Sequence, residues 1–392
     1  MNRLLQKYLK NCAVSFLNRS KPEIIAITGS VGKTSAKDAI FEVLKVKFKD
    51  RIRKSEGNLN NETGVPLAIL GFNKAPSFGA SFLGWLPIVF LAPFRSLLSK
   101  KVEILVLELA ADKPGDIEYL TSFVKPKVAV LTAIGPAHLE AFGTMEKIAE
   151  EKTALLKSLT SDGCAILNLD NDEVRKISDD VTYKKVSYTI KNNADLKAMN
   201  IKTEIDNFKP KTSFIVGDLN LTMPNLGNYA NILAALAGIA CGRIYKLSDK
   251  EIIEGLSNYR SGKHRMNVLR GKNGAIIIDD CYNANPLAME AALNVLREIP
   301  CNGKKIAVLG DMLEIGKISE EAHKLIGEYA KNIADEVIAV GKLAKGYQGS
   351  AYFENSDEAS DYLLKKIKPN DIILIKASRG AELEKIVNNL KA

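Results

Sequence analysis

Residues 28–35 read TGSVGKTS, and they stand between the apolar run IIAI at 24–27 and the helix-like segment AKDAIFEVL at 36–44. This order predicts a buried parallel strand, a glycine turn and the start of a helix. The N–H groups of such a turn and of a helix N-terminus form a cradle for phosphate. The sequence therefore predicts an ATP-binding loop, with an ordinary strand–turn–helix junction as the alternative. The loop is shorter than the common G-x-x-x-x-G-K-[ST] form, which points away from small GTPases.

Different residues of this loop are expected to have different roles in phosphate binding. Gly29 and Gly32 let the backbone turn without side chains, so that its N–H groups can face a polyphosphate. Lys33 supplies a cation for the β- and γ-phosphates, and the hydroxyl of Thr34 or Ser35 can ligate Mg²⁺. The predicted nucleotide-binding residues of the loop are Gly29, Ser30, Gly32, Lys33, Thr34 and Ser35.

Composition places the chain among soluble globular proteins of two or three domains. It has 392 residues, of which 46% are hydrophobic and 26% are charged. The five cysteines lie far apart without a C-x-x-C pair, which argues against a zinc site or a disulfide framework and fits a reducing cytoplasm. The net charge is +9, but the lysines are spread along the chain and aromatic RNA-binding signatures are absent. We therefore expect anionic small ligands and no nucleic acid.

A stretch of 20 residues without a charge, 75–94, is long enough to span a bilayer. A single crossing would, however, place the strands predicted at 24–27 and 104–108 on opposite sides of a membrane, although both should belong to one sheet. Pro76, Pro87 and Pro93 should also break a continuous helix. We expect a hydrophobic insertion that packs as a hairpin or makes peripheral contact with a membrane surface. The location is then cytoplasmic, with the membrane surface as a second option.

Strand-like and helix-like runs alternate along most of the chain, which predicts an α/β fold with a mainly parallel sheet. A second series starts after residue 260, with strands expected at 276–279, 306–309, 337–340 and 372–375. It lacks G-x-G-x-x-G, so we expect a Rossmann-like unit without a dinucleotide. The predicted domains are an N-terminal helix (1–20), a central P-loop ATPase domain (21–260, with a hydrophobic insertion at 75–98) and a C-terminal Rossmann-like domain (261–392).

Three residues outside the loop could take part in metal binding. Glu108 ends a predicted buried strand, where a carboxylate is costly unless it is paired or bound to a metal. His138 follows the next strand and is a plausible metal ligand, although a single histidine is more often structural. Lys152 lies in a predicted helix, where an exposed lysine is the default interpretation.

Longer strings add up to a resemblance that extends from about residue 21 to residue 387. Besides the phosphate loop, they are GNLNNETGVPL (57–67), LELAADKPGDIEYL (107–120), TAIGPAHLE (132–140) with EEK (150–152), DDCYNANP (279–286), LGDMLEIG (309–316) and IKASRGAELE (375–384). With these strings the chain resembles the Mur ligase family. The resemblance implies an ATP-dependent, ADP-forming ligase that makes an amide through an acyl phosphate. Within the family, it implies the addition of D-alanyl-D-alanine to a UDP-N-acetylmuramoyl-peptide, a nucleotide-sugar peptide of peptidoglycan synthesis.

The resemblance also implies two Mg²⁺ sites. Thr34 and Glu108 would serve the first, while His138 and a carbamylated Lys152 would hold the second. Carbamylation has a physical reason, because an ammonium group repels a metal whereas its CO₂ adduct is an anionic oxygen ligand. The implied catalytic set is Lys33, Glu108, His138, Lys152 and Arg265.

Contacts to adenine, ribose and the substrates are also implied. Asn228 and Asn231 match an H-N-x-x-N helix that contacts adenine, but Gly227 stands in place of the histidine. Arg265 matches an arginine that reaches ATP, and Asp280 matches a carboxylate near the ribose. The implied substrate residues are Asn60, Asn61, Tyr282, Asn283, Asn285, Asp311, Glu314, Lys376, Ser378 and Arg379, with capped turns and surface loops as the alternative.

One departure from the family leaves more than one acceptor substrate possible. Members of the family normally begin with a uridine-nucleotide-binding domain, whereas only 23 residues precede the strand predicted at 24–27 here. Another Mur-type ligase, similar to folylpolyglutamate synthase or acting on a cell-wall acceptor without UDP, is therefore an alternative. A non-catalytic ATP-binding scaffold is another. We expect a monomer.

Overall fold

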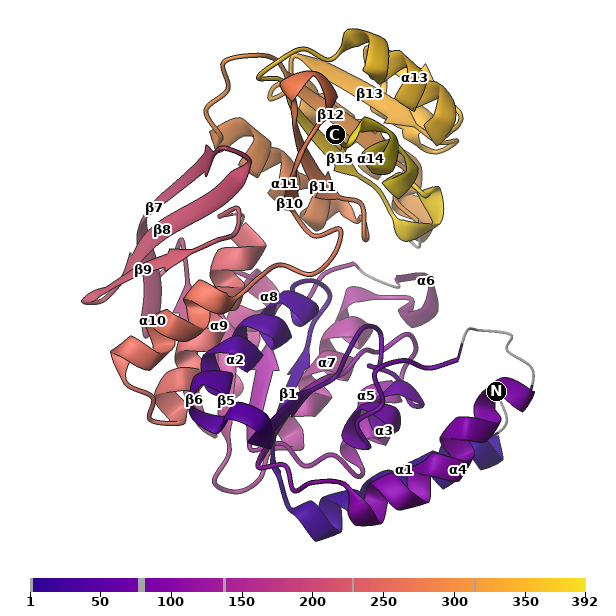
Figure 1. Ribbon diagram of the computed structural model, residues 1–392. Helices are drawn as coiled ribbons and strands as arrows, with labels where there is room; N and C mark the ends of the chain where they lie inside the picture. The colour runs from indigo at the N-terminus through magenta and orange to yellow at the C-terminus, as the bar shows by residue number, and fades with distance from the viewer. Residues whose placement is uncertain (1–2, 77–81, 137–138, 228, 314) are drawn as a thin grey trace. The chain divides into compact units, whose positions relative to one another are not determined.

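The computed structural model describes residues 3–76, 82–136, 139–227, 229–313 and 315–392. The chain forms two compact units (Figure 1). The first unit contains Met1–Gly135, Ala141–Lys197 and Leu233–Leu256, and the second contains Pro136–Glu140, Ala198–Ile232 and Ser257–Ala392. The α/β fold class is confirmed, while the domain boundaries predicted from the sequence stay a prediction.

A parallel sheet forms the centre of the first unit, with the strand order β2-β3-β1-β4-β5-β6. Its strands are β1 (Glu23–Thr28), β2 (Ile52–Lys54), β3 (Ile104–Glu108), β4 (Val128–Leu131), β5 (Cys164–Asn168) and β6 (Lys184–Thr189). All residues of β3 and β4 are buried, as expected for parallel strands covered on both faces. The parallel register brings the carboxyl ends of β1, β3 and β4 to one edge.

Helices surround this sheet, and α2 packs on β1, β2 and β3 while α7 packs on β1 and β4. The helices are α1 (Arg3–Ser20), α2 (Lys33–Phe48), α3 (Gly64–Ile69), α4 (Phe82–Leu98), α5 (Asp116–Thr121), α6 (Leu139–Phe142), α7 (Met145–Lys157), α8 (Asp172–Asp180), α9 (Tyr229–Ile244) and α10 (Asp249–Asn258). The boundary between the two units runs through α6, α9 and α10.

Three strands follow β6 in the sheet order: the first pairs parallel with β6, and the three pair antiparallel with one another. They are β7 (Leu196–Asp206), β8 (Lys209–Val216) and β9 (Leu219–Met223). The first two residues of β7 pair with β6, and from Ala198 onward β7 belongs to the second unit, where it pairs with β8.

The second unit has a sheet of its own, with the order β10-β11-β15-β12-β13-β14, in which only β10 runs antiparallel to its neighbour. Its strands are β10 (Asn267–Arg270), β11 (Ile276–Asp280), β12 (Lys305–Gly310), β13 (Glu336–Val340), β14 (Ala351–Phe353) and β15 (Ile372–Lys376). Its helices are α11 (Pro286–Glu298), α12 (Ser319–Lys331), α13 (Ser356–Lys366) and α14 (Glu384–Leu390). The four strands expected from the sequence are present within about one residue at each end.

Alternate residues of these strands enter two separate cores. Ile278 and Leu309 pack with α11 and α12, whereas Ile277 and Val308 pack with α13 and α14. Neighbouring side chains of a strand point to opposite faces, so both faces of this sheet are covered by helices. Such a sheet needs continuous apolar strands, which is why the sequence pattern was clear here.

The hydrophobic insertion differs from its expectation. Pro87 and Pro93 lie inside α4, although prolines were expected to break a helix there. Pro93 has no N–H for the carbonyl oxygen of Val89, four residues earlier, and the hydroxyl of Tyr8 donates to that oxygen instead at 2.7 Å. A neighbouring helix thus supplies the missing donor. None of the helices within the described ranges combines the length and the apolar character needed to cross a membrane.

We predict that Tyr8→Phe lowers the free energy of unfolding by about 1 kcal/mol, because the carbonyl oxygen of Val89 loses its donor. Pro93→Ala restores the helical N–H, so the same change should cost much less in that background. Urea unfolding of the two single variants and the double variant measures this coupling. An equal cost of Tyr8→Phe in both backgrounds would contradict the assignment.

Candidate active site

The predicted phosphate loop lies between β1 and α2, and both of its glycines are required by the local geometry. Gly29 has a φ of 149°, and a Cβ at this position would come within 2.1 Å of Thr132 Oγ1 and 2.9 Å of the nitrogen of Ala133. Gly32 has a φ of 84° and occupies the N-cap of α2. These backbone conformations favour glycine. The loop can therefore follow this path only without side chains at these two positions.

The remaining loop residues are tied to the segment that follows β4. Ser30 Oγ donates to the carbonyl oxygen of Gly135 at 2.9 Å and accepts from the N–H of Gly135 at 3.0 Å. Thr132 Oγ1 donates to the carbonyl oxygen of Val31 at 2.6 Å. Lys33 Nζ donates to the carbonyl oxygen of Gly29 at 2.6 Å, which folds the lysine back over the loop. Ser35 is buried in the first turn of α2.

Glu108 connects this loop with two other segments. It is the last residue of β3 and is 3% exposed. Its Oε2 accepts from Thr34 Oγ1 at 2.9 Å, and its Oε1 accepts from Asn60 Nδ2 at 3.0 Å. The buried Lys37 places Nζ 3.8 Å from Oε2. A buried carboxylate is costly without such partners, so Glu108 fixes the loop, α2 and the Asn60 segment at one point.

Lys152 is buried in α7, contrary to the default interpretation of an exposed helix lysine. Burial lowers the pKa of its ammonium group to about 7, and the positive charge of Lys33 acts in the same direction against the charges of Glu151 and Asp112. A much larger share of this amine is therefore uncharged at neutral pH than for an exposed lysine. The carboxylate of neighbouring Glu151 accepts hydrogen bonds from the N–H groups of Gly115 at 2.7 Å and Ile117 at 2.6 Å.

The first unit thus brings together most of the residues predicted around the phosphates. Thr34 and Asn60 both donate hydrogen bonds to Glu108, and Lys33 precedes Thr34 in the loop. The charge of Lys33 also helps to lower the pKa of Lys152. Asn61 Oδ1, in contrast, accepts from the N–H groups of Thr63 at 3.2 Å and Gly64 at 2.9 Å. This is the capped turn that was the alternative for Asn61. His138, Asn228 and Glu314 lie outside the described residues.

A second group of predicted residues gathers at the carboxyl ends of β11, β12 and β15. Lys376 Nζ donates to Asp280 Oδ2 at 2.6 Å and to the carbonyl oxygen of Asn283 at 2.9 Å. Burial raises the pKa of the Asp280 carboxyl, while the charges of Lys376 and Arg265 oppose this shift. Ser378 donates its N–H to the carbonyl oxygen of Asp311 at 3.0 Å. Ligands of open α/β sheets collect at such strand ends.

Arg265 lies in a turn whose geometry the sequence did not indicate. Its guanidinium stacks on the ring of Tyr282, 4.0 Å from the centroid. His264 and Met266 on either side have φ values of 59° and 55°, and the N–H of Met266 donates to Asp280 Oδ1 at 3.1 Å. Positive φ is uncommon for these residue types. The turn is held by its contacts and presents Arg265 beside Asp280.

Three residues missed by the sequence analysis support this turn. His264 Nδ1 and Asp279 Oδ2 are 2.7 Å apart, and Cys281 Sγ donates to Asp279 Oδ1 at 2.9 Å. Their ligand atoms lie within 4.8 Å of one another, the distance range of a metal site, but they already bond among themselves. The one available signal was the acidic pair Asp279–Asp280 at the end of an apolar strand.

Other predicted residues have structural partners. Asn231 Nδ2 donates to the carbonyl oxygen of Leu226 at 2.9 Å, and its Oδ1 accepts from the hydroxyl of Tyr259 at 3.0 Å. Asn285 caps α11 by accepting from the N–H of Ala288 at 2.9 Å. Arg379 is exposed at the end of the segment that follows β15. The amide groups of Asn231 and Asn285 thus maintain the local fold in this structure.

Gly227 departs from the family pattern for a steric reason. A Cβ at this position would come within 2.4 Å of Thr203 Oγ1 and 2.5 Å of Thr212 Cγ2. Real Cβ atoms do not approach other atoms so closely, so the histidine of the family pattern would not fit without a shift of β7 and β8.

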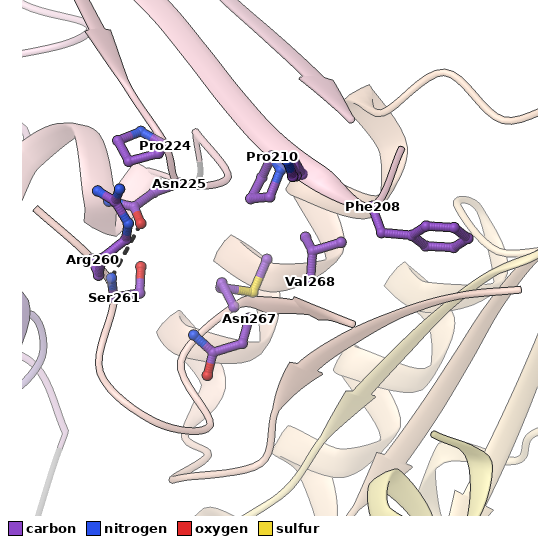
Figure 2. A pocket seen from close by; sticks show the side chains of 10 residues that line it. Phe208, Pro210, Pro224, Asn225, Arg260, Ser261, Asn267 and Val268 are labelled. Carbon is purple, nitrogen blue, oxygen red and sulfur yellow. Dashed lines mark hydrogen bonds between the residues drawn. The ribbon is translucent and has the colours of Figure 1, made fainter. Parts of the chain in front are cut away.

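Figure 2 shows a cavity of about 500 Å³ in the second unit, lined from β8, β10 and the segments before α9 and β10. Asn225 Oδ1 accepts from the N–H of Ser261 at 3.1 Å at its wall. The residues that line this cavity do not include those predicted for nucleotide or substrate. The cavity therefore adds nothing to the predicted site.

Comparison with known proteins agrees with this geometry. The family model "Mur ligase middle domain" matches residues 87–241, and "Mur ligase, glutamate ligase domain" matches residues 264–379. The UDP-N-acetylmuramoyl-tripeptide–D-alanyl-D-alanine ligase of Bacillus subtilis (strain 168) is 30% identical over 97% of this chain and 79% of the relative. The ligase with the same name from Buchnera aphidicola subsp. Baizongia pistaciae is 35% identical over 95% of this chain and 76% of the relative.

A solved structure of a Mur ligase is also similar to this chain. The MurF ligase of Thermotoga maritima in complex with ADP superposes with a TM-score of 0.82 at 28% identity, over 98% of this chain and 83% of that one. The sequence and structure comparisons thus cover both units. The chain belongs to the Mur ligase family.

Proposed function

We propose that this protein is an ATP-dependent, ADP-forming ligase that joins D-alanyl-D-alanine to a UDP-N-acetylmuramoyl-tripeptide. The reaction class rests above all on one observation, the contact of Thr34 in a glycine-shaped phosphate loop with the buried carboxylate of Glu108. The acceptor and the dipeptide rest on similarity to ligases with that printed name over 95–97% of the chain.

In the proposed reaction, the β- and γ-phosphates of ATP lie against the N–H groups of the loop, and Lys33 turns from the carbonyl oxygen of Gly29 toward them. A carboxylate oxygen of the peptide attacks the γ-phosphorus in line, the bond to the ADP oxygen breaks, and an acyl phosphate forms. The amine of the dipeptide then attacks the acyl carbon and loses a proton. Phosphate leaves with the electron pair of the C–O bond, and an amide remains.

Magnesium fits the oxygen donors of the first unit. The hydroxyl of Thr34 and the carboxylate of Glu108 are hard oxygen ligands already within 2.9 Å of each other. They would hold one Mg²⁺, and His138 with a carbamylated Lys152 would hold a second; both ions would offset the negative charge of the phosphates.

Carbamylation of Lys152 is supported by its surroundings. Only an uncharged amine adds CO₂, and burial makes this form abundant by lowering the pKa of the group to about 7. The positive charge of Lys33 would favour the anionic product, while the negative charges of Glu151 and Asp112 would oppose it.

The remaining predicted residues receive roles in the same proposal. Arg265 and Asp280 would contact the nucleotide, and Lys376, Ser378 and Asp311 would form part of the dipeptide pocket, since they gather at the ends of parallel strands. Five free thiols suit a reducing cytoplasm, and we retain the monomer as the expected state.

We predict that Lys33→Ala and Glu108→Gln each lower kcat/KM by at least about a hundredfold, since each removes charge stabilisation during phosphoryl transfer. The measurement is ADP release with UDP-N-acetylmuramoyl-tripeptide and D-alanyl-D-alanine. Lys45→Ala, an exposed lysine on the same helix α2, is the matched control and should keep wild-type rates. Equal activity of Lys33→Ala and Lys45→Ala would refute the phosphate assignment.

The substrate is tested in the same assay by changing the acceptor. We expect ADP release with the UDP-linked tripeptide and none with a folate plus glutamate. A muropeptide without UDP should be a poor acceptor. ADP release with the folate pair alone would favour the folylpolyglutamate-like alternative, and ATP binding without release under any acceptor would favour a scaffold.

Carbamylation predicts a carbonyl signal in ¹³C NMR after incubation with ¹³C-bicarbonate. The signal should weaken as the pH falls below about 7, because the protonated amine of Lys152 does not react. Lys152→Ala should abolish it, and Lys157→Ala, an exposed lysine of the same helix, should not. A signal that survives Lys152→Ala belongs to another amine and would exclude the assignment.

A further inference from the structure

Helix α4 exposes an apolar face. Phe90 and Leu98 are 68% and 77% exposed, and the other large apolar side chains of this face are Leu86, Leu91, Phe94 and Leu97. Their spacing of three and four residues places them along one side of the helix. Ile88, Ala92 and Ser96 alternate with them on the opposite, buried side. One side of the helix thus packs on the first unit, and the other side exposes phenylalanine and leucine side chains to solvent.

Helix α1 lies beside α4 and runs in the same direction (Figure 1). Tyr8, in the first half of α1, donates to the carbonyl oxygen of Val89 in the middle of α4. Arg19, at the end of α1, donates to the carbonyl oxygens of Ser96 at 2.9 Å and Ser99 at 2.8 Å, at the end of α4. The outward face of α1 carries Arg3, Leu4 and Lys7. We call the two helices with the adjoining Lys100 and Lys101 the α1–α4 platform.

The platform and the residues that flank it carry a large surplus of positive charge, and seven basic residues belong to the platform itself. Residues 1–22 and 72–102 contain nine lysines and arginines and neither aspartate nor glutamate, and the formal net charge of the whole protein is also +9. The rest of the chain is therefore balanced, with equal numbers of basic and acidic residues. Lysines and arginines occur along the whole chain, but these two segments hold them without any aspartate or glutamate, and one of these segments contains the exposed apolar helix.

We propose that the α1–α4 platform docks on the surface of an anionic lipid bilayer. The exposed face of α4 enters the headgroup region, and Lys7, Lys100 and Lys101 contact the anionic headgroups. Apolar side chains rimmed by lysine and arginine are the composition of helices that lie in a membrane interface. Helix α4 extends roughly 25 Å along its axis and lacks the length and apolar character needed to cross the bilayer.

The charge of the platform favours an anionic bilayer over a second copy of the chain as its partner. Two platforms facing each other would bring like charges together, because neither segment contains an aspartate or glutamate, and the pair of Lys100 with Asp50 at 3.9 Å is exposed to solvent. A monomeric protein rarely leaves an apolar patch of this kind uncovered. An anionic bilayer satisfies both the apolar face and the cations at once.

Flotation of the full-length protein with vesicles tests the proposal. We expect the protein to float with vesicles of phosphatidylcholine containing about one third phosphatidylglycerol, and to bind pure phosphatidylcholine at least about tenfold more weakly. Phe90→Ser with Phe94→Ser removes the apolar anchor, and Lys100→Glu with Lys101→Glu reverses the rim charge. Each pair should lower partition by about tenfold or more, and about 1 M salt should weaken the wild type, since screening then acts within about 3 Å.

The matched controls lie on the exposed side of α12. Leu325→Ser and the pair Lys324→Glu with Lys331→Glu make the same chemical changes away from the platform and should float as the wild type does. Wild-type ADP release without vesicles shows that each platform variant is folded. Failure of the wild type to float, equal loss with the α12 variants, or a stable dimer by light scattering that Phe90→Ser with Phe94→Ser dissociates would each overturn the proposal.

Discussion

A carboxylate buried at the end of a strand must be compensated, and Glu108 shows how this constraint organises the first unit. Its two oxygens take hydrogen bonds from Thr34 and Asn60, and the buried Lys37 lies 3.8 Å from Oε2. Losing Lys37 would leave the carboxylate without its charged partner in the interior, and losing the donor of Thr34 or Asn60 would leave one of its oxygens without a hydrogen bond. The phosphate loop, α2 and the 57–63 segment are therefore held by the same group that would serve a metal ion, so structure and chemistry depend on one residue.

The fold could be predicted from the sequence because its strands are buried on both faces. Continuous apolar runs such as Ile276–Ile278 have little choice of structure, and the glycine turn marked the first strand-to-helix junction. The prediction that prolines would break the helix was wrong at α4, because the local rule for proline does not take account of contacts from other helices. Tyr8 donates to the carbonyl oxygen that Pro93 leaves unpaired, 81 residues away in sequence. A helix can continue through proline when tertiary structure supplies such a donor, and no local pattern reveals this.

The site was predictable to the extent that it follows strand ends. Glu108 and Asp280 close buried strands, so their place at the ligand-binding edge follows from topology. The His264–Asp279–Cys281 network could not be foreseen, because it depends on left-handed backbone at His264 and Met266 that the sequence does not encode locally. At Asn61 and Asn285 the local structure shows a structural role, and the substrate role stays a prediction. The oxygen of Asn285 caps α11, and the oxygen of Asn61 accepts from the N–H groups of the turn that leads into α3.

The distribution of charge separates phosphate binding from membrane attraction. Near the phosphate loop the cations are already matched, with Lys37 and Lys54 both close to Asp38 and Lys37 also facing Glu108. A nucleotide would therefore be held by local N–H groups and Lys33 rather than by a broad positive field, whose reach in any case ends within about 8 Å at physiological salt. The nine unbalanced charges lie instead in two segments that α1 and α4 place side by side. These charges lie outside the residues predicted to bind phosphate or substrate, so a separate interaction such as the proposed docking is a physical reason for their concentration.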